Sequence, residues 1–173
     1  MNVRQSESTP TKNRTTVERK SECELVITRT INGPARLVFE AWTKPELFTR
    51  WWIPKSLGLT LLSCEQDVRV GGSYRLVFDR GNSEPMAFFG QYLEVTPSSR
   101  LVWTNEESGD DGAVSTLTLE EKGGKTLVVM SERFRSKEAC DAAMASGAYD
   151  AMGETFDQLD ELLVTLGASA GQS

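Results

Sequence analysis

The 173-residue sequence contains no histidine at all. This absence excludes Ser–His and Cys–His catalysis, histidine metal sites and the commonest general base near neutral pH. The three cysteines, Cys23, Cys64 and Cys140, show no metal-ligand spacing, and an odd number of them is typical of a protein from a reducing cytosol. We therefore expect no metal and no cofactor, and any catalysis has to use Asp, Glu, Tyr, Lys, Arg or Cys.

The sequence also has no run of about 18 apolar residues, the length that a membrane-spanning helix needs. Its first residues include no apolar stretch of the kind found in secretory signals. Together these two absences predict a cytoplasmic protein without membrane insertion. The net charge of −6 argues against general nucleic-acid binding.

The two ends of the chain have little apolar surface to bury. Residues 1–22 are rich in Ser, Thr, Arg, Lys and Glu, so burial cannot offset the entropy that ordering would cost. We predict that this segment is a disordered polar tail and that residues 168–173 are disordered as well. Residues 23–167 are then expected to form one domain.

The last long segment, residues 149–166, has apolar side chains three and four positions apart, which is typical of one face of an α-helix. Asp160 and Glu161, between these positions, are expected to be solvent-exposed. Gly153 costs about 1 kcal/mol relative to Ala inside a helix, so we expect it to make room for a close strand or a ligand. The apolar stripe comprises Tyr149, Met152, Phe156, Leu159, Leu163 and Leu166.

Most of the sequence before this helix predicts β-strands, which are rich in β-branched residues or alternate between apolar and polar side chains. Two short helices, over 34–43 and 45–52, follow the first strand, and a short helix or lid is expected over 136–146. Gly90 inside a strand suggests a β-bulge. The expected strands are residues 24–31, 59–65, 73–79, 86–95, 101–105, 114–121 and 126–134.

This order of elements predicts an α+β protein rather than a doubly wound one, because antiparallel hairpins dominate. A curved antiparallel sheet of about six to seven strands must cover its concave face. The C-terminal helix is the one long apolar element that can do so. We therefore predict a helix-grip fold, in which the sheet wraps around the long helix.

Several segments resemble a known family when they are taken in order. The stretches VFEAWTKPELFTRWW, DVRVGGSYR, FGQYLEVTPSSRLVWT and GETFDQLDELL are similar to bacterial homologues of the C-terminal domain of the activator of the heat-shock-protein-90 ATPase. That family belongs to the START/Bet v 1-like (SRPBCC) superfamily, and the resemblance covers about residues 22–167. It implies a hydrophobic cavity between sheet and helix, and a connection with the stress response. It does not imply one activity, because superfamily members bind lipids, sterols or polyketides, and some are cyclases or hydrolases.

Aromatic side chains are the main candidates for a ligand pocket, because they bury large areas and stack on flat apolar ligands. The resemblance places Trp51 and Trp52 there through its WW-x-P pattern, and it favours the face of strand 126–134 that carries Met130 as the inward one. Glu132 then points to the cavity or its rim, as a possible general base, whereas the alternative is a solvent-facing charge. The predicted pocket residues are Trp51, Trp52, Phe78, Phe88, Trp103, Met130, Glu132, Tyr149, Met152 and Phe156.

Three functions remain open at this stage. The first is binding of a small hydrophobic molecule, without catalysis. The second is an enzyme of cyclase or hydrolase type that acts on a hydrophobic substrate in the same cavity. The third is a chaperone-interacting module that activates an ATPase. A homodimer through an exposed sheet edge or helix face is compatible with all three.

Overall fold

Within residues 15–79, 81, 84–106 and 112–171, which the computed structural model describes, eight strands form one antiparallel sheet. Their spatial order is β1-β2-β8-β7-β6-β5-β4-β3. The strands are β1 (Thr16–Ser21), β2 (Glu24–Ile31), β3 (Thr60–Gln66), β4 (Ser73–Asp79), β5 (Met86–Thr96), β6 (Arg100–Thr104), β7 (Val114–Lys122) and β8 (Lys125–Arg133). The helices are α1 (Ala35–Thr43), α2 (Pro45–Phe48), α3 (Lys137–Ala145) and α4 (Met152–Gly171), with the 3₁₀ turns η2 (Lys55–Leu57) and η4 (Ala148–Ala151).

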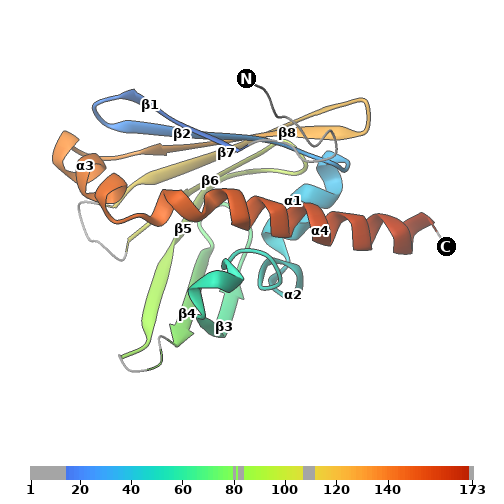
Figure 1. Ribbon diagram of the computed structural model, residues 1–173, viewed down its shortest axis with the longest axis horizontal. Helices are drawn as coiled ribbons and strands as arrows, with labels where there is room; N and C mark the ends of the chain where they lie inside the picture. The colour runs from blue at the N-terminus through green and yellow to red at the C-terminus, as the bar shows by residue number, and fades with distance from the viewer. Residues whose placement is uncertain (1–14, 80, 82–83, 107–111, 172–173) are drawn as a thin grey trace, which may run out of the picture.

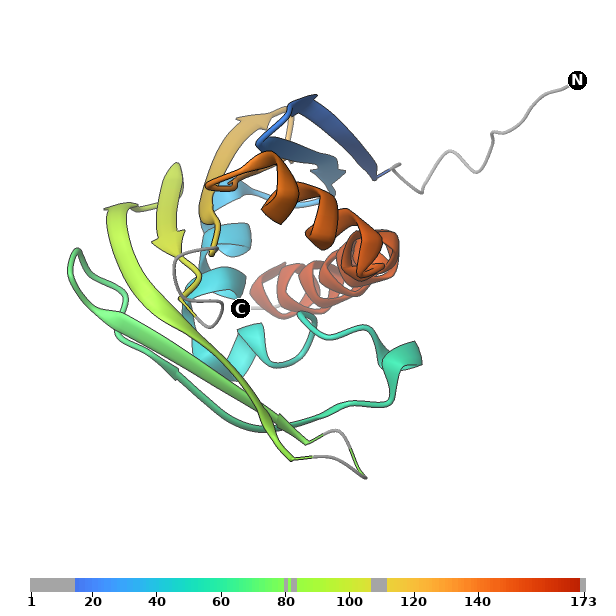
Figure 2. The ribbon, with the colours of Figure 1, turned by 90° about the vertical axis from the view of Figure 1, so that its left-hand side faces the viewer.

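The sheet curves around α4. Figure 1 shows α4 running across the strands, and Figure 2, viewed nearly along the helix, shows the sheet bending around it. The apolar stripe of α4 faces this sheet, and Phe156, Leu159 and Leu163 are almost completely buried. The predicted helix-grip fold is therefore confirmed, with one strand more than expected.

The additional strand is β1, which lies in the segment predicted to be a disordered tail, so that prediction is wrong for residues 16–21. β1 pairs with β2 from Thr16 opposite Thr28 to Ser21 opposite Glu24. All its side chains are exposed. Backbone hydrogen bonds hold the strand, and composition does not report these bonds. Residues 1–14 of the predicted tail lie outside the described residues.

The predicted second helix ends early, at Phe48, and Trp51 and Trp52 follow in a turn. Polar bonds fix this turn. The indole Nε1 of Trp51 donates to the carbonyl of Ala41 at 2.9 Å, and the side-chain amide of Gln158 donates to the carbonyl oxygens of Trp51 and Ile53 at 2.8 and 2.9 Å. Gln158 belongs to α4, so the long helix satisfies the backbone of a segment that has no regular structure of its own.

The long helix differs from its prediction at both ends. Residues 148–151 form the 3₁₀ turn η4, and α4 continues to Gly171. The prediction of a disordered end is therefore wrong for residues 168–171, while residues 172–173 lie outside the described part. Gly167 does not cap the helix, because its φ is not positive, and α4 contains no proline.

Asp160 was expected to be exposed, and this expectation is wrong. Its carboxylate lies 2.6 Å from Nη2 of Arg29, and it also accepts a hydrogen bond from the backbone N–H of Asn32 at 2.9 Å. Arg29 lies on the inward face of β2, with a side chain only 2% exposed. A buried guanidinium needs an anionic partner, so α4 supplies Asp160 together with Asp157, 2.8 Å away.

Gly90 does not mark a β-bulge. β5 pairs regularly with β4 through this residue, and the irregularity lies between Tyr92 and Glu94, against β6. A Cβ at position 90 would overlap the backbone carbonyl of Thr104 in β6. The glycine therefore permits a close approach of two strands, which is the other meaning of glycine inside a strand.

Candidate functional site

A cavity of about 740 Å³ opens between the sheet and the first half of α4. Strands β3 to β8 form one wall, and the η2 loop, α3, η4 and the start of α4 form the other. Its size is within the range of small-molecule sites, which measure about 300–1,000 Å³. Most of its surface is apolar, with contributions from Leu76, Met86 and Leu101 of the sheet.

Most of the predicted pocket residues lie in this wall. They come from the turn after α2, from β5, β6 and β8, and from the start of the C-terminal helical segment. The aromatic ones present flat apolar surface to the interior. These residues are Trp52, Phe88, Trp103, Met130, Glu132, Tyr149 and Met152.

Trp51, Phe78 and Phe156 do not line the cavity, so their prediction as pocket residues needs correction. All three are completely buried in the core. Trp51 and Phe156 stack with ring centroids 6.2 Å apart, and Phe78 packs edge-on against Phe88 at 5.5 Å. The double-tryptophan pattern thus divides its roles: Trp51 is a core residue, and its neighbour Trp52 reaches the cavity.

The prediction that the Met130 face of β8 points inward is borne out by the burial pattern. Thr126, Val128 and Met130 are buried, whereas Leu127 and Val129 are only half-buried. Glu132 follows on the same face and lines the cavity. Its carboxylate accepts a hydrogen bond from the hydroxyl of Tyr149 at 2.9 Å and another from the hydroxyl of Ser115 on β7.

This polar group extends to β6 and β4. The Asn105 side-chain amide donates to Oγ of Ser115 and to the carbonyl of Ala113, both at 2.9 Å. The hydroxyl of Tyr74 lies 2.7 Å from the carbonyl of Thr104 and 3.3 Å from Oδ1 of Asn105. We call these five side chains the Glu132 cluster: Tyr74, Asn105, Ser115, Glu132 and Tyr149.

Two phenols of the cavity wall, Tyr149 and Tyr92, stay protonated at neutral pH. Burial, reinforced by the Glu132 carboxylate, raises the pKa of Tyr149 well above its ordinary value. Burial likewise raises the pKa of Tyr92 to about 12, although a hydrogen bond from Gln66 opposes this shift. Burial also raises the pKa of the Cys64 thiol to about 11, with a smaller effect of Glu65. Cys64 is therefore a thiol at neutral pH rather than a reactive thiolate.

Sequence reasoning did not select Gln66, Tyr74, Tyr92, Asn105 or Ser115 as pocket residues, yet all five line the cavity. For Tyr74 a signal existed, because the alternation of residues 73–79 places it on one face with Leu76 and Phe78. For Asn105 and Ser115 the sequence offers no comparable signal. Their role depends on how β6, β7 and β8 are paired, which single strands do not reveal.

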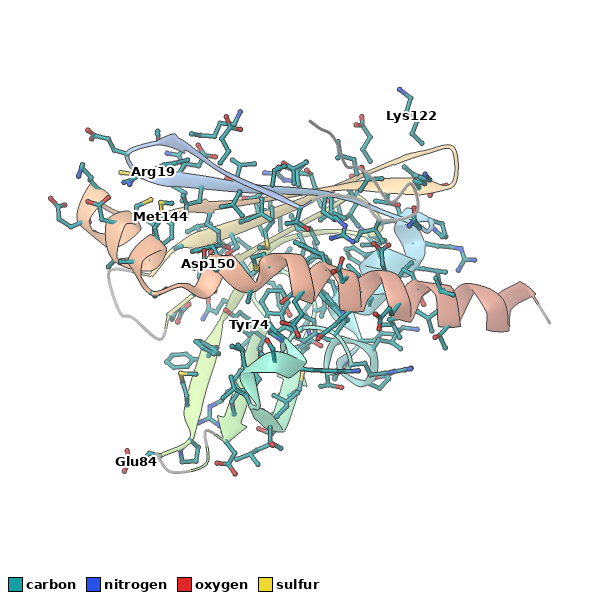
Figure 3. All side chains as sticks on the ribbon, in the orientation of Figure 1. Arg19, Tyr74, Glu84, Lys122, Met144 and Asp150 are labelled. Carbon is teal, nitrogen blue, oxygen red and sulfur yellow. The ribbon has the colours of Figure 1, made fainter. Side chains whose placement is uncertain are left out.

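Helix α3 covers part of the cavity. Ala139, Ala142 and Ala143 contribute to its wall. From β1, Arg19 reaches this helix, with its guanidinium 2.7 Å from the carboxylate of Asp141 and 4.0 Å from the sulfur of Met144. Figure 3 shows Arg19 and Met144 side by side at this end of the molecule. Strand β1, which composition did not predict, is thus bonded to α3, the helix that covers part of the cavity.

Two classes of site are not found in the described part of the chain. There, no three His, Cys, Asp or Glu side chains gather as a metal site would need. No described helix has both the length and the apolar composition needed to cross a membrane.

Solved structures share this fold. A protein of Rhodobacter sphaeroides is 24% identical with a TM-score of 0.81, over 88% of this chain and 99% of that one. A Nitrosomonas europaea protein is 25% identical with a TM-score of 0.78, over 87% and 99%. A Staphylococcus epidermidis protein is 27% identical with a TM-score of 0.72, over 87% and 94%.

Sequence comparison leads to the family. No curated protein matches the chain. The family model described as Activator of Hsp90 ATPase homolog 1-like protein matches residues 32–164, from the turn after β2 to Val164 in α4. This match covers most of the helix-grip domain, including every segment that builds the cavity. The chain therefore belongs to the family of Activator of Hsp90 ATPase homolog 1-like proteins.

Proposed function

We propose that the protein binds a small hydrophobic molecule in the cavity between the sheet and α4. The observation that carries this proposal is the cavity itself, with a volume of about 740 Å³ and aromatic residues in its wall. A protein that only needed stability would fill such a space, because each unfilled apolar volume forfeits packing energy. Trp52 and Trp103 offer flat faces on which a ring-containing ligand can stack.

A direct test uses native mass spectrometry of the full chain purified from its own host. A retained molecule that is released on unfolding is the expected result, and its mass identifies the chemical class. A second test blocks the cavity. Ala142→Phe places a large ring on the face of α3 that lines the cavity, and Ala145→Phe places the same ring on an exposed position of the same helix outside the cavity wall.

The expected result is that Ala142→Phe weakens the binding of an apolar fluorescent probe at least tenfold and that Ala145→Phe leaves it unchanged. Trp52 and Trp103 supply the intrinsic signal, because both lie in the wall. Equal binding by both variants, or a native protein without any retained molecule and without affinity for apolar probes, would contradict the proposal.

A second candidate function is catalysis on the same kind of molecule, and the Glu132 cluster is the observation that favours it. A carboxylate bonded to two hydroxyl groups inside an apolar cavity is a suitable general base. Tyr149 keeps its proton at neutral pH, so it cannot serve as the base in such a reaction. Unchanged turnover of an identified substrate by Glu132→Gln would remove this candidate.

A further inference from the structure

The hydrogen atoms of the Glu132 cluster are already committed within the protein. The hydroxyls of Tyr149 and Ser115 both donate to the Glu132 carboxylate. The two side-chain N–H groups of Asn105 point to Ser115 Oγ and to the carbonyl of Ala113, and that carbonyl can only accept. The hydroxyl of Tyr74 has oxygen acceptors at 2.7 and 3.3 Å, so its single hydrogen is also in use.

The groups that the cluster offers to a bound molecule are therefore acceptors. A carboxylate has about four lone-pair positions, and a phenol oxygen that donates its hydrogen keeps two lone pairs. The Asn105 orientation is fixed by the carbonyl of Ala113, so Oδ1 is the acceptor end of that amide. Within this cluster, a ligand group that only accepts hydrogen bonds meets hydrogens that protein oxygens already hold.

The charge of Glu132 also favours a ligand group that donates hydrogen bonds. Glu132 carries its carboxylate into a cavity whose surface is mostly apolar, where interactions between charges are less screened than in bulk water. A second carboxylate, on the ligand, would be repelled there. A hydroxyl or an ammonium group would instead donate to Glu132 or to the oxygens beside it, and the ammonium would also gain from opposite charge.

We propose that the cavity selects apolar, ring-containing molecules with a hydrogen-bond-donating head group, a hydroxyl or an amine, and that it discriminates against carboxylates. The head group lies at the Glu132 cluster, and the ring system lies between Trp52, Phe88 and Trp103. This inference rests on the proposed function, because it assigns the ligand class for the same cavity.

The test uses four naphthalene probes that share one ring system and differ in the head group: naphthol, protonated naphthylmethylamine, methoxynaphthalene and naphthoate. Binding to the full chain is followed by tryptophan fluorescence and calorimetry. Naphthol and the amine are expected to bind about tenfold or more tighter than methoxynaphthalene, because a hydrogen bond to a charged group is worth about that much. Naphthoate is expected to bind weakest.

Glu132→Gln replaces an acceptor by an amide that also donates. The advantage of naphthol over methoxynaphthalene is then expected to fall several-fold, and naphthoate is expected to gain affinity. The matched control is Glu120→Gln, an exposed carboxylate on β7 outside the cavity wall, which is expected to keep all four affinities. Circular dichroism and thermal melting show whether each variant is folded.

A second variant keeps the test decisive should Glu132→Gln fail to fold. Tyr149→Phe retains the ring and removes one donor from Oε1 of Glu132, so the preference for naphthol over methoxynaphthalene is expected to increase. An unchanged or smaller preference overturns the inference.

The outcomes separate the two proposals. Four probes that bind equally well to the native chain overturn the selection for donors and leave the apolar binding site standing. Tighter binding of naphthoate than of naphthol does the same. Failure of every probe to bind contradicts the proposed function, and the inference fails with it.

Discussion

The two halves of the α4 stripe have the same spacing but different surroundings. Leu159 and Leu163 lie in a closed core against α1 and the sheet, and they are at most 2% exposed. Met152, about two turns before Leu159, borders a cavity of about 740 Å³, as does Tyr149 in the turn before α4. The periodicity of a helix tells which side chains face inward, but it does not tell whether the space in front of them is filled.

The closed half also contains a buried ion cluster, in which Arg29 bonds to Asp157 and Asp160. The hollow half has the Glu132 cluster, which is bonded mainly through hydroxyl and amide groups. This contrast indicates that charge at the closed end attaches the helix to the sheet, while the polar groups at the hollow end border the cavity.

The largest expected effect concerns Arg29. Arg29→Ala takes the buried guanidinium away from Asp157 and Asp160, whose side chains are 31% and 15% exposed, and we expect a loss of at least about 3 kcal/mol in the free energy of unfolding, the low end for broken buried pairs. Urea denaturation measures this value. The matched control is Arg100→Ala, whose exposed bond to Glu94 is expected to contribute less than about 1 kcal/mol. Equal losses would refute the idea that the ion cluster attaches α4.

The next effect compares the two halves of the stripe directly. Leu163→Ala is expected to cost about 3 kcal/mol, because it opens a void in a filled core. Met152→Ala is expected to cost clearly less, about 1–2 kcal/mol, because one side of Met152 already faces the cavity and loses no contacts there. The same denaturation experiment compares them, and a larger cost at Met152 would mean that the cavity is filled in solution.

The pH dependence of the free energy of unfolding gives a further test at the cavity end of the molecule. The pKa of Tyr92 is raised to about 12 in the folded protein, against about 10 for an unfolded tyrosine. Folding therefore favours the protonated form, so this contribution is complete below pH 10 and is lost as the pH rises to about 12. Its size is on the order of 2 kcal/mol. Tyr92→Phe should lessen the fall in stability over that range, and an identical fall would contradict the assignment.

The smallest effect concerns two glycines, Gly153 within α4 and Gly33 packed against it. A Cβ at Gly153 would meet nothing within 4 Å, and its φ is not positive, so Gly153→Ala is expected to stabilise the protein by about 0.4–1 kcal/mol. At Gly33 a Cβ would overlap the side chain of Leu163, so Gly33→Ala is expected to destabilise it. Thermal melting of both variants checks the pair, and stabilisation by both would show that the closed end has spare room.

Gly153 illustrates what could and could not be predicted from the sequence. Helix periodicity and strand alternation predicted the fold and most strand bounds within a residue or two, because side-chain burial depends on these periods. Gly153 was expected to make room for a close strand or a ligand; no strand approaches it, since a Cβ there would meet nothing within 4 Å, and it is not among the residues that line the cavity. Periodicity places a residue on a face, and only the packed structure shows what lies opposite.

The predicted pocket residues show the same distinction between what periodicity predicts and what only the packed structure shows. Met130 and Glu132 could be placed because a strand alternates and the resemblance selected one face. Trp51 and Trp52 could not be separated, because adjacent residues in a turn have no fixed period. The Glu132 cluster depends on the pairing of β6, β7 and β8, and in particular on Ser115 lying opposite Glu132. Pairing of that kind is a property of the assembled sheet.

Strand β1 affects how readily another chain can add a strand to the sheet. It forms one edge of the sheet, and its side chains, among them Glu18, Arg19 and Lys20, are all exposed. Charged edges discourage other chains from adding a strand. A chain cut after residue 21 would instead present the backbone of β2, whose alternate residues Leu25, Ile27 and Ile31 are apolar. Removal of the polar segment before β2 is therefore expected to favour strand-to-strand aggregation.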